Sequence, residues 1–288
     1  MMRLVVQHPR LEASTIDRFA AELGRAPDRA SARVATWNGL TPDSRLRARL
    51  RILGEHHSVD ANLVRMGLRL ADFRLIVFDM DSTLITIECI DEIADHAGRR
   101  AEVTAITEAT MRGEIADFAE SLRRRVACLR GVPQEALQQV LDERVRLSPG
   151  VESLLAGVKA AGLSTLLVSG GFSYFTDALR ARLGLDHARS NRLEVVDGRL
   201  SGRLVGPIVD ADFKRDEVLR RCAAMGIEPK RAIVVGDGAN DLRMMSIAGL
   251  SVAWQAKPIV RERADIALTH GGLDSLFDVF EEPGRSDS

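Results

Sequence analysis

The sequence predicts an α/β protein in which a doubly wound parallel sheet carries an inserted helical cap and follows a small N-terminal α+β domain. From residue 149 onward, short apolar runs that suit buried strands alternate with helical patterns, as in parallel sheets covered on both faces. Residues 89–148 show helical spacing alone, between two such runs. Residues 1–70 have strand and helix patterns of their own. We therefore expect domains at 1–70 and 71–288, with the cap at about 89–148.

The N-terminal region shows no catalytic constellation. Its patterns predict strands at 4–6 and 32–37 and helices at 14–23 and 44–53. Four arginines are spread around the second helix, which favours a solvent-exposed face over a phosphate site. These are Arg45, Arg47, Arg49 and Arg51. We expect this region to pack on the rest of the chain or to form a homodimer, with binding of a regulatory ligand as the alternative.

The core sheet is predicted to begin at the apolar run Leu75 to Phe78. Asp197-Gly198 suits the tight turn of a β-hairpin between 194–196 and 199–204. Further strands are expected at 164–168, 232–235, 250–254 and 266–268. Helices are expected in the cap at 90–97, 103–111, 118–129 and 134–145, and in the core at 151–161, 172–183, 212–225 and 244–248.

Composition excludes several classes of protein. A formal net charge of -1 and only 4% aromatic residues argue against a nucleic-acid or anionic-membrane partner. Three widely spaced cysteines form no zinc pattern and indicate free thiols in a reducing compartment. No apolar run approaches the ~18 residues of a membrane span, and the N-terminus lacks an apolar leader. We therefore expect a cytoplasmic protein without a membrane partner.

Polar residues follow three of the predicted buried strands. Asp79 and Asp81 follow the first, Ser169 follows the second, and Asp237 follows the third, shortly before Asn240 and Asp241. Each set by itself is also explained by helix capping. Because sites in open α/β sheets form outside the carboxyl ends of the strands, three such sets on one sheet predict a common site.

The residue types in this site suit phosphate chemistry with a cation. Carboxylates gathered at one point repel each other unless a hard divalent cation joins them, and oxygen ligands suit Mg²⁺. Ser169 and the amides of Gly170 and Gly171 offer donors to a phosphate before a helix N-terminus. Lys214 can neutralise a phosphate oxygen, although a lysine considered alone is more often at the surface.

At these residues the chain resembles the haloacid dehalogenase-like phosphatases. The shared motifs are DMDST at Asp79 to Thr83, Ser169, Lys214, and GDGAND at Gly236 to Asp241, and the resemblance covers about residues 74–275. It is greatest to members that hydrolyse O-phospho-L-serine in the last step of serine biosynthesis, through the segments IECIDEIAD, SLRRRV and VSGGF. Residues 1–70 lie outside this match and are similar to ACT-like regulatory domains.

The resemblance implies a covalent mechanism. Asp79 is implied to be the nucleophile that forms an aspartyl-phosphate, and Asp81 the general acid and base. Mg²⁺ is implied to be held by the carboxylates of Asp79 and Asp237 and the backbone carbonyl of Asp81, with Asp241 in support.

The resemblance also implies how phosphoserine is bound. The phosphoryl end would meet four residues, Ser169, Gly170, Lys214 and Asn240. Glu88 would bind the substrate ammonium and Arg125 its carboxylate, while Arg123 and Arg124 on successive faces of the same helix are expected in solvent. Met111 and Phe118 would line the pocket.

Two other classes of function share part of this residue set. A signalling receiver domain also carries a phosphorylated aspartate, a hydroxyl and a lysine, but it is much smaller, lacks a helical insertion and has no acid two residues after the nucleophile. A phosphotransferase of the same family, or a phosphatase for another small phosphorylated metabolite, stays open as the alternative. The sequence leaves undecided the role of residues 1–70 and the oligomeric state.

Overall fold

The computed structural model describes residues 1–281, apart from the side chain of Met111. Its contacts divide the chain into two compact units. The first unit comprises Met1–Ile76, Pro149–Leu163 and the segment from Gly226 onward, and the second comprises Val77–Ser148 and Ser164–Met225. None of the helices among the described residues has the length and apolar character needed to span a membrane.

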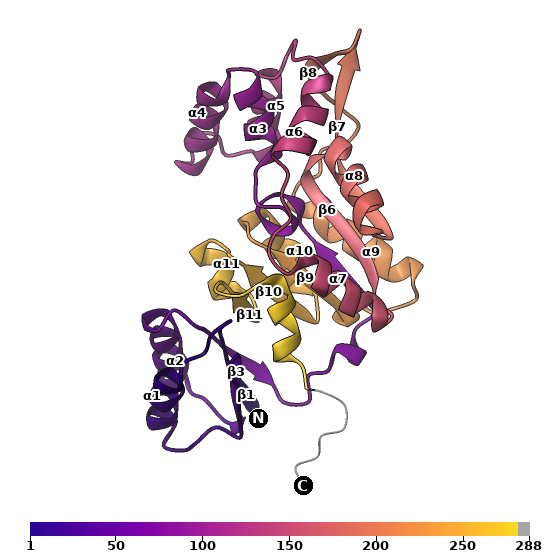
Figure 1. Cartoon of the computed structure of the whole chain (residues 1–288). Coiled ribbons are helices and arrows are strands. Elements are labelled where there is room, and N and C mark those ends of the chain that lie inside the picture. The colour runs from indigo at the N-terminus through magenta and orange to yellow at the C-terminus, as the bar shows by residue number, and fades with distance from the viewer. Residues whose placement is uncertain (282–288) are drawn as a thin grey trace. The chain divides into compact units, whose positions relative to one another are not determined.

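The first 65 residues form a complete βαββαβ arrangement (Figure 1). Its four-stranded antiparallel sheet has the order β2-β3-β1-β4, and both helices pack on it around buried Phe19, Trp37 and Leu50. The elements are β1 (Met2–Gln7), α1 (Ala13–Leu23), β2 (Arg29–Ala30), β3 (Val34–Leu40), α2 (Ser44–His56) and β4 (Asp60–Arg65). The sequence predicted both helices and two of the strands but missed β2 and β4. The four arginines of α2 are exposed, as expected.

Strand β4 was missed because its buried positions are polar. Asp60 and Asn62 are buried and Val64 follows on the same face, so the usual apolar alternation is absent. Both polar side chains bond to backbone in the segment Ile266–His270 of the same unit. The Asn62 amide exchanges two hydrogen bonds with the backbone of Ala267, at 2.9 and 2.8 Å. The Asp60 carboxylate accepts from the backbone amides of Thr269 and His270.

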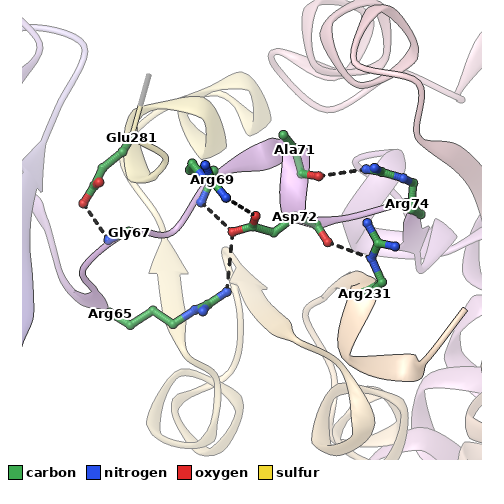
Figure 2. A network of polar contacts seen from close by, with 8 residues as sticks. All are labelled: Arg65, Gly67, Arg69, Ala71, Asp72, Arg74, Arg231 and Glu281. Carbon is green, nitrogen blue, oxygen red and sulfur yellow. Dashed lines mark hydrogen bonds and ion pairs between the residues drawn. The ribbon is translucent and has the colours of Figure 1, made fainter. Parts of the chain in front are cut away.

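The segment that leads out of this arrangement is held by polar contacts around Asp72 (Figure 2). The Asp72 carboxylate accepts from the backbone amide and the guanidinium of Arg69, and its backbone carbonyl accepts from Arg231 Nε at 3.1 Å. Glu281 Oε1 accepts from the Gly67 amide at 2.9 Å. Residues 67–74 are therefore bonded at several points within the first unit.

The large sheet has the strand order β11-β10-β9-β5-β6-β7-β8, with β5 in the middle. Strands β9, β10 and β11 pair in parallel, as do β6 and β7, whereas β7 and β8 form the antiparallel hairpin expected around Asp197-Gly198. The predicted α/β class is thus confirmed, with one antiparallel edge. The strands are β5 (Leu75–Phe78), β6 (Ser164–Phe172), β7 (His187–Val196), β8 (Arg199–Val205), β9 (Ala232–Gly236), β10 (Leu250–Trp254) and β11 (Ile266–Leu268). The helices between them are α7 (Val151–Ala160), α8 (Ser173–Leu183), α9 (Ala211–Ala224), α10 (Leu242–Ile247) and α11 (Pro258–Arg263).

Four helices follow β5 in the second unit and lie together beside the β7–β8 hairpin (Figure 1). They are α3 (Cys89–His96), α4 (Arg100–Met111), α5 (Phe118–Ala127) and α6 (Glu135–Glu143). The two chain segments that enter and leave this group pair with each other, since Ile85 and Leu147 form an antiparallel bridge and the Thr86 amide donates to the Arg146 carbonyl at 3.0 Å. Insertion of the helices therefore leaves their two ends side by side.

Candidate active site

The reactive acid predicted at the end of β5 is buried against a lysine. Strand β5 is fully buried, and Asp79, which follows it, is 5% exposed. Its Oδ1 accepts from the Met80 amide at 2.7 Å, and its Oδ2 lies 2.8 Å from Lys214 Nζ. Lys214 lies in the first turn of α9 and is completely buried, so it is not the surface lysine that its sequence context alone would suggest.

Asp81 lies in a tight turn rather than in the strand. The strand ends at Phe78, and residues 80–84 form an irregular turn with Ser82 at a φ of 55°. Asp81 Oδ1 accepts from the Cys89 amide at 3.2 Å. Burial raises the pKa of the Asp81 carboxyl well above its usual range, the negative charges of Glu88 and Asp79 raise it further, and hydrogen bonds with Cys89 lower it in part. This environment favours the protonated acid.

The loop at Ser169 brings a hydroxyl and two glycines close to Asp81. Ser169 is buried, and its Oγ accepts from the Gly171 amide at 2.9 Å. A Cβ at Gly171 would lie 2.6 Å from Asp81 Oδ2, so a side chain there would collide with the acid. The sequence predicted that the strand ends at Val168, whereas β6 continues to Phe172 with a shift of register in this loop.

Arg125 and Glu88 supply opposite charges near Asp81. Arg123 and Arg124 are exposed, as expected, whereas Arg125 is partly buried and its Nε has no hydrogen-bond partner among the described residues. Burial lowers the pKa of Arg125, and the charges of Glu88, Asp91 and Asp81 act against that lowering. A buried guanidinium nitrogen without a partner is suited to receiving an anion.

Glu88 is exposed at the start of α3, and its side chain is bonded to Ser82 in the turn that follows Asp79. Its Oε1 accepts from Ser82 Oγ at 2.7 Å, a contact that the sequence did not predict. A Cβ at Gly170 would lie 3.4 Å from Phe118 Cζ, so Phe118 of α5 lies against the loop at Ser169. Met111, the other expected lining residue, has a side chain outside the described part of the chain.

The first unit carries the third predicted set of polar residues, after β9. The backbone amides of Asp237 and Gly238 donate to Asp241 Oδ2 at 3.2 and 3.1 Å, and Asp241 is completely buried. Asn240 lies in the same short turn. Gly236 leaves room for Asp241, because an added Cβ would lie 2.8 Å from the Cβ of that acid.

Three acids were expected near the metal ion: Asp79 in the second unit, which is buried, and Asp237 and Asp241 in the first unit, of which Asp241 is completely buried. All offer carboxylate oxygens, the donor type that Mg²⁺ prefers. The donor set therefore fits the cation that the sequence predicts, and it contains two of the three residues expected to be ligands.

Comparison with known proteins identifies the family of the chain. The model of the haloacid dehalogenase-like hydrolase family matches residues 76–246, which is more than half of the chain. The chain therefore belongs to the haloacid dehalogenase-like hydrolases, and it is an enzyme.

The similar proteins are more specific than the family. The chain is 57% identical over 222 residues to the phosphoserine phosphatase of Polaromonas sp., an alignment that covers 76% of this chain and 94% of that protein. A crystal structure of a probable phosphoserine phosphatase from Vibrio cholerae has a TM-score of 0.82 and 36% identity, covering 96% of this chain and 85% of the other. A substrate-bound phosphoserine phosphatase complex has a TM-score of 0.68 and 37% identity, covering 73% of this chain and 99% of the other.

Proposed function

We propose that this enzyme hydrolyses O-phospho-L-serine to L-serine and phosphate through an aspartyl-phosphate intermediate. The observation that carries the choice of substrate is the Nε of Arg125, which is buried without a hydrogen-bond partner and subject to the charges of Glu88 and Asp81. An amino-acid head group needs both a bidentate cation for its carboxylate and an anion for its ammonium, and Arg125 and Glu88 are these two groups. The phosphoserine phosphatases among the similar proteins support the same substrate.

Asp79 is the proposed nucleophile. A carboxylate oxygen of Asp79 attacks phosphorus, the bond from phosphorus to the serine oxygen breaks, and the phosphoryl group is transferred to the enzyme. Lys214, 2.8 Å from Asp79 Oδ2, limits the repulsion between the carboxylate and the incoming phosphate and can then bind a phosphoryl oxygen. Ser169, Gly170 and Asn240 are the remaining proposed phosphoryl ligands.

Asp81 is the proposed general acid and base. The serine alkoxide is a poor leaving group, so a proton must reach its oxygen as the bond to phosphorus breaks. The pKa of Asp81 is raised by burial and by the charges of Glu88 and Asp79, which favours the protonated carboxyl that this step needs. After serine leaves, the carboxylate of Asp81 accepts a proton from the water that hydrolyses the aspartyl-phosphate.

We further propose that Mg²⁺ is held by Asp79, Asp237 and the backbone carbonyl of Asp81, with Asp241 in support. When bound, it supplies positive charge that lowers the repulsion between carboxylates and phosphate. The residues after β9 contribute to this role through the bonds that orient Asp241.

Phosphate release from a panel of phosphomonoesters with Mg²⁺ tests the proposal. We expect kcat/KM for O-phospho-L-serine to exceed that for phosphoethanolamine and glycerol phosphate, because these compounds lack one or both charged groups of the amino acid. A preference for one of those compounds would overturn the substrate. Transfer of phosphate to added serine or homoserine instead of water would favour the phosphotransferase alternative.

We retain residues 1–70 as a proposed separate domain that packs on the core or mediates a homodimer. Its support is the complete βαββαβ arrangement, which has a hydrophobic cluster of its own. Analytical ultracentrifugation of the full chain and of a chain that begins at residue 71 tests the homodimer, which is overturned if the full chain sediments as a monomer.

A further inference from the structure

The β6–β7 pairing is interrupted at the serine loop. Val168 pairs with Arg189 and Phe172 pairs with Asn191, so three residues of β6 lie opposite a single residue of β7. Such a bulge leaves backbone groups without ladder partners, and buried backbone groups without partners are costly. The Gly170 carbonyl is one of the groups that the bulge removes from the ladder.

A buried asparagine side chain takes the place of the missing ladder bond. Asn191 is 2% exposed, and its Nδ2 donates to the Gly170 carbonyl at 2.7 Å. Its Oδ1 accepts from the Val209 amide at 2.8 Å. Both partners are backbone groups with a fixed donor or acceptor role, so only this orientation of the carboxamide satisfies them.

These bonds hold both ends of one peptide group. The carbonyl of the Gly170–Gly171 peptide accepts from Asn191, and its N–H donates to Ser169 Oγ at 2.9 Å. Because the Ser169 oxygen accepts there, its own hydroxyl hydrogen is free to donate elsewhere. We propose that Asn191 is a positioning residue that orients this peptide and thereby aims the Ser169 hydroxyl hydrogen at the substrate phosphoryl group. The proposal rests on the proposed phosphatase function.

The other end of the Asn191 carboxamide reaches the segment that carries Lys214. Val209 immediately precedes Asp210, which is the N-cap of α9. The backbone carbonyl of Asp210 accepts a hydrogen bond from the Lys214 amide at 2.9 Å. One side chain therefore joins the serine loop to the start of the lysine helix.

A double-mutant cycle with Ser169 tests the positioning role. Asn191→Asp keeps the acceptor for Val209 and loses the donor for Gly170, because an ionised carboxylate only accepts. We expect kcat/KM to fall about 10- to 100-fold, as for other misaligned catalytic groups, and Ser169→Ala to lower it about 100- to 1,000-fold. In the Ser169→Ala background, Asn191→Asp should cost less than about threefold, because coupled residues are not additive. Full additivity of the two effects would overturn the proposal.

The chain offers a matched control at Asn62. This buried carboxamide also donates to one backbone carbonyl and accepts from one backbone amide, on Ala267. Asn62→Asp should lower the thermal midpoint to a similar extent and leave kcat/KM within about twofold of the wild type, because Asn62 contacts none of the proposed catalytic or substrate-binding residues. An equal loss of activity in both variants would mean that the Asn191 effect is general instability.

A second variant and a second substrate extend the cycle. If Asn191→Asp does not fold, Asn191→Ser is used in the same cycle with the same expected coupling. The cycle is repeated with p-nitrophenyl phosphate, which shares only the phosphoryl group with phosphoserine. If the wild type hydrolyses p-nitrophenyl phosphate but not phosphoserine, and the two mutations are coupled for the aryl substrate, the positioning role is supported and phosphoserine is overturned as the substrate. If the two effects are additive with both substrates, the positioning role itself is overturned.

Discussion

Two buried aspartates, Asp60 in β4 and Asp79 after β5, differ in what surrounds them. Each is 5% exposed. The carboxylate of Asp60 is satisfied by the backbone amides of Thr269 and His270. Asp79 receives the Met80 amide on one oxygen and the ammonium of Lys214 on the other. The backbone amides that bind Asp60 are fixed in position by the fold. The flexible side chain of Lys214 can instead exchange its bond to a carboxylate oxygen for a bond to a phosphoryl oxygen.

Burial by itself therefore does not distinguish a catalytic acid from a structural one. Burial raises the pKa of Asp60, and the amides of Thr269 and His270 act against that rise. Burial also raises the pKa of Asp81, but there the charges of Glu88 and Asp79 raise it further. Asp81, whose neighbours are other acids, is therefore suited to exchanging a proton. Asp60, which is bonded to backbone donors, instead joins two segments of the fold.

The strongest test of this distinction is Asp79→Asn. The amide is not a useful nucleophile, so we expect kcat for phosphoserine to fall by about four orders of magnitude or more, as for other nucleophile variants. Steady-state phosphate release measures the loss, and circular dichroism checks the fold. Retention of more than about a hundredth of wild-type turnover would contradict the nucleophile assignment.

The next largest effect is expected for Asp81→Asn. The loss of general acid catalysis should lower kcat for phosphoserine about 100- to 10,000-fold. Aryl phosphates have leaving groups that need little protonation, so p-nitrophenyl phosphate should be affected much less. The ratio of the two losses is the measurement, and equal losses would show that Asp81 does not act as the acid.

Charge recognition of the substrate should have a smaller and more selective effect. Arg125→Ala removes the partly buried partner of the substrate carboxylate, worth roughly 2–5 kcal/mol in kcat/KM for phosphoserine. Glu88→Gln should act in the same direction with a smaller loss, because Glu88 is exposed. p-Nitrophenyl phosphate has neither charged group and should be nearly unaffected. Arg124→Ala is the matched control, because Arg124 is an exposed arginine of the same helix that is paired with Glu120. Parallel losses on both substrates would assign the two residues to folding.

The smallest effect on catalysis is expected at the other buried acid. Asp60→Ala leaves the amides of Thr269 and His270 without an acceptor and should lower the free energy of unfolding by about 1–3 kcal/mol. We expect kcat/KM within about twofold of the wild type. Denaturant unfolding followed by activity assays measures both quantities, and a loss of activity in the folded variant would contradict a purely structural role for Asp60.

The pH dependence of Asp60→Ala has a definite sign. Since the folded pKa of Asp60 is raised, the folded state holds this proton more tightly than the unfolded state. The contribution of Asp60 to stability is therefore greatest at low pH and declines as the pH rises through the window just above the ordinary aspartate pKa. The destabilisation by Asp60→Ala should shrink across that window, and a growing difference would contradict the raised pKa.

Much of the fold and of the candidate site was predictable from sequence. The buried strand Leu75 to Phe78 is continuous and apolar, and Asp79, Ser169 and Asp237 follow such strands directly. In an α/β sheet, this order along the chain is enough to predict one common edge. Only the resemblance to a known family favoured Arg125 over Arg124 as the substrate-binding arginine, since the helical pattern allows either residue to turn inward.

What the sequence could not predict depends on partners distant in the chain. The inward positions of β4 are polar because they bond to the Ile266–His270 segment, so no local alternation marks the strand. The bulge that carries β6 through Ser169 to Phe172 is completed by Asn191, about twenty residues later and outside every motif.

The sequence by itself determined the α/β class, the order of the elements and the residue types at the strand ends, because apolar periodicity and chemical composition are local properties. Only the tertiary structure decided that Lys214 is fully buried against Asp79, and that Asn191 holds the Gly170 carbonyl. The physical reason is that burial and hydrogen bonding of a residue depend on other residues that are distant in the chain. A lysine or an asparagine has the same local pattern at a surface or in a core until the chain brings its partner to it.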